Sequence, residues 1–139
     1  MNMISTKGRY ALRLMVDLAQ HQKEGYVPLM EIAKRQDISE KYLENILKGL
    51  VKEKMLTGIR GKGGGYRLTK APEDYTVGSI LRAAEGELAP VTCLEADAAP
   101  CPRRAECPSL PVWQKLNDMV QDYLDSITLG DLMPERQIS

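Results

Sequence analysis

The chain has 139 residues, 43% of them hydrophobic, which is enough to bury one core but too few for a cofactor domain beside a substrate domain. Its formal net charge of zero argues against a uniformly basic protein, but residues 1–70 carry fourteen Lys or Arg against seven Asp or Glu, and residues 71–139 carry five against twelve. We therefore expect the first half to attract phosphate, unless the charges form only an ordinary solvated surface.

The sequence begins MNMISTKGRYALRLM, which contains no long apolar run and no small-residue cleavage site. Signal peptides and membrane-spanning helices need such features. We therefore expect a cytoplasmic protein with no membrane partner, whose thiols are kept reduced.

A first helix is predicted from Thr6, a plausible N-cap, because apolar residues follow at helical spacing. These are Tyr10, Ala11, Leu14, Met15, Leu18 and Ala19. Arg9 and Arg13 lie one turn apart, on a face that could contact a DNA backbone or simply be solvated.

A helix-turn-helix is predicted next. Residues 29–36 form a short helix, Asp37 and Ile38 a turn, and Ser39 the N-cap of a longer helix. That longer helix has an apolar stripe formed by Leu43, Ile46, Leu47, Leu50 and Val51. Its opposite face then carries Lys41, Asn45, Lys48 and Lys52, flanked by Tyr42 and Glu44. A helix with such a basic face is typical of one that enters the major groove.

Two predicted strands, LTGIR and YRLT, flank the Gly-rich segment GKGGG, which can take positive φ at several positions. With the preceding helices, this hairpin predicts a winged helix. It carries Arg60, Lys62 and Arg67, and a narrow minor groove could accept an arginine. A phosphate-binding loop is disfavoured, because no helix N-terminus and no terminal Lys-Ser/Thr follow the glycines.

A connecting helix and a long last helix complete the expected elements. Thr76 is expected to cap the first of these, which ends at Gly86, and Pro111 to start the second. The last helix has an apolar seam of Trp113, Leu116, Val120, Tyr123 and Ile127, widened by Met119 and Leu124. Packing within the chain could cover this seam, but a symmetric dimer would also pair two winged helices for palindromic half-sites.

All three cysteines, Cys93, Cys101 and Cys107, lie in one Pro- and Ala-rich loop with the spacing C-x7-C-x5-C. Structural cysteines scatter among apolar positions, and an odd number cannot close into intramolecular disulfides. The loop therefore favours a soft metal or an iron-sulfur cluster, with a thiol redox sensor or no specific chemistry as alternatives.

Four segments carry a resemblance to a known family: STKGRYALRLMVDLA, ISEKYLENILKGLVKEKML, IRGKGGGYRL and SITLGDL. Together they are similar to the iron-sulfur-cluster transcription regulators that include IscR, NsrR and CymR, and SITLGDL looks closest to IscR. The resemblance implies a homodimeric winged-helix regulator of double-stranded DNA with a palindromic operator. It further implies an iron-sulfur cofactor, [2Fe-2S] with [4Fe-4S] as the alternative, and cluster assembly genes as targets.

The resemblance also implies roles for single residues. Cys93, Cys101 and Cys107 match the cluster ligands, Glu44 matches a position that discriminates between DNA sites, and Arg60 matches the wing arginine of the minor groove. Ser39 and Tyr42 match contacts of the recognition helix. The expected DNA-binding set is Arg9, Ser39, Lys41, Tyr42, Glu44, Asn45, Lys48, Arg60 and Lys62.

The sequence departs from the family pattern at two places. The first cysteine gap is x7 where IscR members have x5, and Leu110 stands where they have a histidine ligand. Members similar to NsrR use an aspartate of the partner's first helix, but the matching place here is about Arg9. The candidates for a fourth ligand are Glu95, Asp97, Glu106 and His21, with an exogenous thiol or water as alternatives.

The predicted fold is thus mainly α with a small β-hairpin wing: a winged helix-turn-helix over residues 1–72, a connecting helix over 73–90, a cysteine loop over 91–110 and a dimerisation helix with its tail over 111–139. The predicted function is a regulator that senses cluster status. A redox-, zinc- or nitric-oxide-sensing repressor of the same fold is the alternative. An enzyme with a small-molecule substrate is disfavoured, because no Cys-His-Asx or metalloprotease motif is present.

Overall fold

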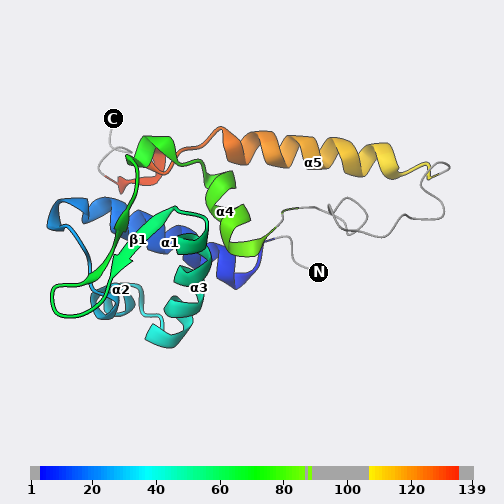
Figure 1. The fold of residues 1–139 in the computed structure, drawn as a ribbon. Coiled ribbons are helices and arrows are strands. Elements are labelled where there is room, and N and C mark those ends of the chain that lie inside the picture. The colour runs from blue at the N-terminus through cyan, green and yellow to red at the C-terminus, as the bar shows by residue number, and fades with distance from the viewer. Residues whose placement is uncertain (1–3, 87, 89–106, 135–139) are drawn as a thin grey trace.

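The computed structural model describes residues 4–86, 88 and 107–134 (Figure 1). The elements are α1 Thr6–Gln20, α2 Leu29–Gln36, α3 Glu40–Lys52, β1 Leu56–Ile59, β2 Gly65–Leu68, α4 Val77–Glu85 and α5 Leu110–Asp125, with 3-10 turns at Gln22–Glu24, Pro72–Asp74 and Gly130–Leu132. This arrangement confirms the predicted class, mainly α with a β-hairpin wing.

Helix α1 lies at the centre of the domain and is buried along one face. Ala11, Leu14 and Met15 are completely buried there. Ser5 caps the helix by accepting the backbone N–H of Lys7 at 3.2 Å, so the prediction of Thr6 as the cap was wrong by one residue. A carboxylate from the end of α4 also lies at this helix start: the N–H of Gly8 donates to Glu85 Oε1 at 2.7 Å. A negative charge is favourable there because the first N–H groups of a helix are unpaired.

The helix-turn-helix forms as predicted. Asp37 ends α2 in the left-handed region, and Ser39 caps α3 by accepting the N–H of Tyr42 at 3.2 Å. The stripe of α3 is buried at Leu43, Ile46, Leu47 and Leu50. Val51 is 38% exposed, so its assignment to the core was wrong. It lies at the edge of the stripe that faces the hairpin, and no described residue covers it there.

The hairpin pairs β1 with β2 antiparallel, with Gly58 opposite Tyr66. Gly61 and Gly63 have positive φ in the turn, as the Gly-rich segment predicts. A third segment pairs with β2: Val27 and Tyr66 exchange backbone hydrogen bonds of 2.8 and 2.9 Å. Three backbone segments therefore hold the wing in one orientation on α1 and α3.

A buried carboxylate joins α1 to α2. Asp17 is 1% exposed and accepts hydrogen bonds from Arg35 at 2.7 and 3.0 Å and from Gln36 at 2.9 Å. This carboxylate raises the pKa of the Arg35 guanidinium, because it stabilises the charged form. The pair fixes the last turn of α2, and thereby the start of the turn to α3.

Helix α5 contacts the rest of the chain near its C-terminal end. Leu124 and Ile127 pack there against Val77, Leu81 and Leu88. Arg82 of α4 donates to both oxygens of Asp125 at 2.8 and 2.9 Å and to Gln121. Ile127, predicted as part of the intermolecular seam, thus lies in a cluster of its own chain.

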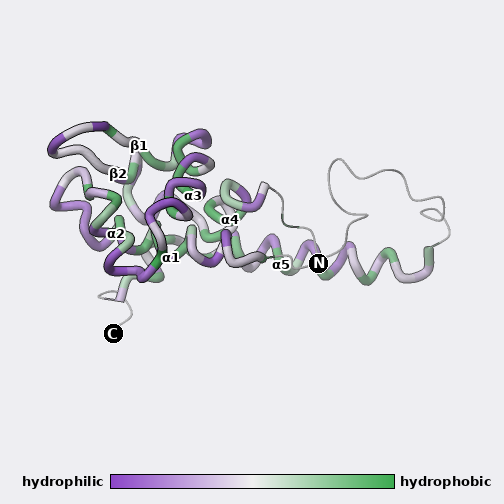
Figure 2. The backbone as a smooth tube through the Cα atoms, turned by 90° about the horizontal axis from the view of Figure 1, so that it is seen from below, coloured by the Kyte–Doolittle hydropathy of each residue, from purple (hydrophilic) through white to green (hydrophobic). Residues whose placement is uncertain are grey.

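The rest of α5 extends away from the domain in both views of the chain (Figures 1 and 2). None of its residues is buried, and five large apolar side chains are exposed: Val112, Trp113, Leu116, Met119 and Tyr123. Figure 2 shows hydrophobic and hydrophilic residues alternating along this projecting helix. None of the helices in the described ranges is both long and apolar enough to span a membrane.

Candidate nucleic-acid interface

The outer face of α3 presents polar and basic side chains to solvent. Lys41, Glu44, Asn45 and Lys48 are exposed, and Tyr42 is half-buried, as the helical geometry predicts. Together with Ser39 these residues surround a shallow hollow of about 490 Å³ at the start of the helix. Because the Ser39 hydroxyl accepts the N–H of Tyr42, its own proton remains available to an acceptor outside the helix.

Tyr42 is positioned by α1. Its ring meets that of Tyr10 edge-on, with the centroids 5.8 Å apart, and Arg13 lies 5.1 Å from the centroid of Tyr10. Arg13 also donates to the side-chain and backbone oxygens of Gln36, at 3.1 and 2.6 Å. The predicted face of Arg9 and Arg13 is therefore divided. Arg13 holds the helices together, whereas Arg9 is exposed and, within the described residues, its side chain donates only to Thr6 of its own helix, at 3.2 Å.

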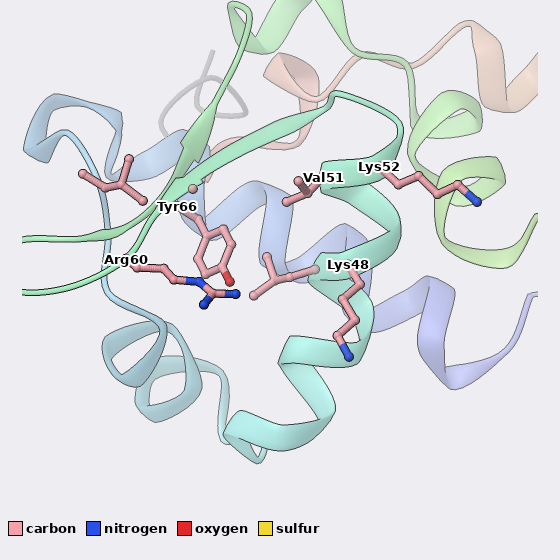
Figure 3. Close-up of a pocket in the computed structure, with 8 residues that line it drawn as sticks. Lys48, Val51, Lys52, Arg60 and Tyr66 are labelled. Atoms are coloured by element: carbon pink, nitrogen blue, oxygen red, sulfur yellow. The ribbon is translucent and has the colours of Figure 1, made fainter.

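A second hollow of about 430 Å³ lies between α3 and the hairpin (Figure 3). Its floor is apolar, formed by Leu47, Val51 and Ile59. Its rim carries three cations, Lys48 and Lys52 from α3 and Arg60 from the hairpin, together with the Tyr66 ring. Figure 3 shows Arg60 and Tyr66 pointing from the hairpin into the space in front of α3.

The basic residues divide into two groups by their partners. Four arginines are held within the chain: Arg13 by Gln36, Arg35 by Asp17, Arg67 over the Tyr26 ring at 4.8 Å, and Arg82 by Asp125. In the part of the chain that the structure describes, five others on α3 and the hairpin have no hydrogen-bonding or ionic side-chain partner: Lys41, Lys48, Lys52, Arg60 and Lys62. Their charges are therefore available to an external anion. Lys23, Lys34 and Lys115 also have no such partner among the described residues, but they lie outside α3 and the hairpin.

The cysteine site lies mostly outside the described residues. Cys93 and Cys101, and the ligand candidates Glu95, Asp97 and Glu106, fall there. Cys107 is described: its sulfur lies 3.3 Å from the Ser109 hydroxyl, just before α5, and this contact is the main reason why the pKa of the thiol is lowered. Leu110, at the place where the resemblance to IscR predicts a histidine ligand, is the first residue of α5. The ranges 4–86, 88 and 107–134 contain no group of three ligating side chains.

His21, the remaining ligand candidate, is the C-cap of α1, and the C-terminal end of that helix lies far from the start of α5 (Figure 1). Its Nδ1 lies 2.7 Å from the backbone oxygen of Asp17. The structure thus does not bring His21 toward Cys107 within one chain.

The sequence predicts the three cations around the second hollow but not the role of its exposed apolar and aromatic side chains, Val51, Ile59 and Tyr66. Val51 was assigned to the core, and Ile59 and Tyr66 were assigned only to strands. The available signal was the alternation of β2, which puts Tyr66 and Leu68 on one face, with the glycine opposite Tyr66 leaving room for a ring.

Comparison with known proteins gives the family. The Rrf2 family model, which describes iron-dependent transcriptional regulators, matches residues 4–135. Over 135 residues the chain is 36% identical to the HTH-type transcriptional regulator IscR of Aliivibrio salmonicida, covering 97% of this chain and 79% of that protein. The IscR of Pectobacterium carotovorum is 35% identical over 135 residues, with 97% and 81% covered.

Solved structures agree with these relatives. CymR, the global cysteine regulator of B. subtilis, superposes with a TM-score of 0.76 at 37% identity, covering 100% of this chain and 99% of that chain. IscR of T. potens gives a TM-score of 0.73 at 39% identity, with 93% and 84% covered. These relatives are transcription regulators and not enzymes, which confirms the prediction that this chain has no enzymatic activity. The chain is a member of the Rrf2 family of winged-helix transcriptional regulators.

Proposed function

We propose that the protein is a cytoplasmic homodimer that binds a palindromic operator through α3 in the major groove and the hairpin in the minor groove. The observation that carries this proposal is the set of five unpartnered cations on α3 and the hairpin, because phosphate contacts dominate the affinity of DNA-binding proteins. Arg60 enters the minor groove, and Glu44, exposed on α3, selects among operators by accepting a hydrogen bond from cytosine.

We expect Arg60→Ala and Lys48→Ala each to weaken operator binding about tenfold. Each variant should also reduce the slope of log affinity against log salt concentration, by roughly one for each phosphate that is no longer neutralised. Binding is measured by fluorescence anisotropy at several salt concentrations, on the strongest duplex selected from a random library. Lys115→Ala is the matched control, because Lys115 is equally exposed but lies on α5. An unchanged slope in both test variants contradicts the proposed interface, and an unchanged operator preference in Glu44→Ala contradicts its role.

We further propose that Cys93, Cys101 and Cys107 hold an iron-sulfur cluster, most simply [2Fe-2S], and that cluster status controls iron-sulfur assembly genes. The described part of the site fits this use. Cluster ligands are thiolates, and the Cys107 thiol has a lowered pKa and lies at the start of an exposed helix. A bound cluster would add a redox-active group. Loss of this group would signal a low iron supply or the presence of an oxidant. It would also link Cys93 and Cys101 to Cys107 at the start of α5.

Cys107→Ser is expected to remove the cluster. Wild-type protein purified without oxygen should contain iron and sulfide in comparable amounts and should absorb visible light. The variant should lose most of its iron and sulfide, because the serine hydroxyl is a poor ligand for cluster iron. Ser109→Ala is the control, since it changes the surroundings of the thiol but leaves the sulfur in place. A colourless wild-type protein with stoichiometric zinc contradicts the cluster.

A thiol-sensing repressor is the second candidate. Leu110 supplies no ligand atom at the family's fourth position, and the similarity to CymR covers the whole of this chain and 99% of the other. One similar solved structure is an oxidised form of the CymR of Staphylococcus aureus, with a TM-score of 0.74 at 34% identity. Metal analysis distinguishes the two candidates, because only the cluster protein contains iron and sulfide.

A further inference from the structure

The hollow between α3 and the hairpin has a composition that neither the core nor an ordinary surface explains. Ile59 is 49% exposed and Val51 is 38% exposed, on a floor completed by Leu47. Three cations, Lys48, Lys52 and Arg60, stand around this apolar floor. Such a combination fits a ligand that is apolar on one side and anionic on the other.

Tyr66 is held over this hollow by its backbone. Its N–H and C=O pair with Val27, and its ring lies against Gly58 of the opposite strand. A Cβ added to Gly58 would lie 2.8 Å from Cε1 of that ring, closer than carbon atoms can pack, so only glycine leaves the ring this place. The hydroxyl has no hydrogen-bond partner among the described residues. A rigidly placed and unused donor therefore points into the hollow (Figure 3).

The position of the hollow determines what can occupy it. If α3 lies in the major groove and the hairpin in the adjoining minor groove, the sugar–phosphate strand between the two grooves must pass between these elements. A deoxyribose has an apolar face that suits the floor, and the phosphates carry the negative charge that suits the rim.

We propose that this hollow seats the sugar–phosphate strand that separates the two grooves, and that the Tyr66 hydroxyl donates a hydrogen bond to one of its phosphates. Val51 and Ile59 pack against the sugar on the 5′ or 3′ side of that phosphate, while Lys48 and Arg60 supply the charge. Tyr66 thereby sets the depth to which α3 and the hairpin enter their grooves. This inference rests on the proposed DNA-binding function and adds a contact to it.

The test is Tyr66→Phe, which removes only the hydroxyl. Operator affinity is expected to fall about tenfold, the size of a missing hydrogen bond to a charged acceptor. The salt slope is expected to stay that of the wild type, because a neutral hydroxyl releases no counterion. Thermal unfolding should be unchanged, because the hydroxyl has no partner in the described part of the chain. Tyr26→Phe is the matched control, since its ring lies under Arg67 and outside the hollow.

A scan of the duplex identifies the phosphate. Paired methylphosphonate substitutions remove the charge of one phosphate and of its symmetry equivalent in the other half-site, one such pair at a time, and each duplex is titrated with wild type and Tyr66→Phe. The difference between the two proteins is expected to disappear at one phosphate, or at two adjacent ones, between the grooves. The inference is overturned if Tyr66→Phe binds like the wild type, or if the difference persists at every position. Arg60→Ala separates this result from failure of the proposed interface. It weakens binding if the interface is correct, whether or not Tyr66 contributes, and it leaves binding unchanged if the interface is wrong.

Discussion

Met119→Glu is expected to convert the proposed dimer into a monomer. Met119 lies in the middle of the exposed stripe of α5 and is 58% exposed, between Leu116 and Tyr123. In a symmetric helix pair, each protomer would bury this side chain against the partner, so the variant would bury two unpaired carboxylates near the dyad. Each buried charge costs several kcal/mol and the apolar contacts of Met119 are lost, so we expect the four exposed apolar side chains that remain on α5 not to hold the pair together. Sedimentation equilibrium measures the change in mass directly.

Met30→Glu is the matched control for this experiment. Met30 is 64% exposed and undergoes the same chemical change, but it lies on α2, away from the stripe. It is expected to leave the mass of the assembly unchanged. Operator affinity should fall at least about a hundredfold in Met119→Glu, because two linked half-sites bind far more tightly than two separate monomers. A dimeric Met119→Glu protein would show that the stripe of α5 is not the interface.

The elements that follow from the sequence are those with a regular apolar period. Leu43, Ile46, Leu47 and Leu50 recur at helical spacing and are buried as predicted, which fixes the opposite, exposed side of α3 by geometry alone. The hairpin turn is equally predictable from its glycines, because a backbone with positive φ strongly favours this residue type.

The features that cannot be predicted from the sequence depend on contacts between residues far apart in the chain. Val51 belongs to the stripe by spacing, but its exposure depends on where the hairpin lies. Arg67 and Arg13 resemble DNA-contacting cations until their partners, Tyr26 and Gln36, are placed beside them. Metal ligands follow no period at all, so spacing does not identify a fourth ligand for the proposed cluster.

Arg35→Ala is expected to destabilise the protein by about 3 to 5 kcal/mol, because it leaves the buried carboxylate of Asp17 without its cation. Asp17→Asn is expected to cost less, about 2 kcal/mol, since the Arg35 side chain is 31% exposed and can be rehydrated. Urea unfolding at one fixed protein concentration measures both values. Asp118→Asn, an exposed carboxylate on α5, is the control and should change the free energy of unfolding by less than about 0.5 kcal/mol.

The double variant Asp17→Asn/Arg35→Ala tests the physical cause. If the cost of Arg35→Ala comes from an uncompensated buried charge, neutralising Asp17 in the same chain must recover part of the stability. If the cost comes from weaker packing around the missing arginine stem, the double variant must be at least as unstable as Arg35→Ala alone. The first outcome also predicts weaker operator binding in Arg35→Ala than its folded fraction explains, because the pair fixes the turn of α2 that leads into α3.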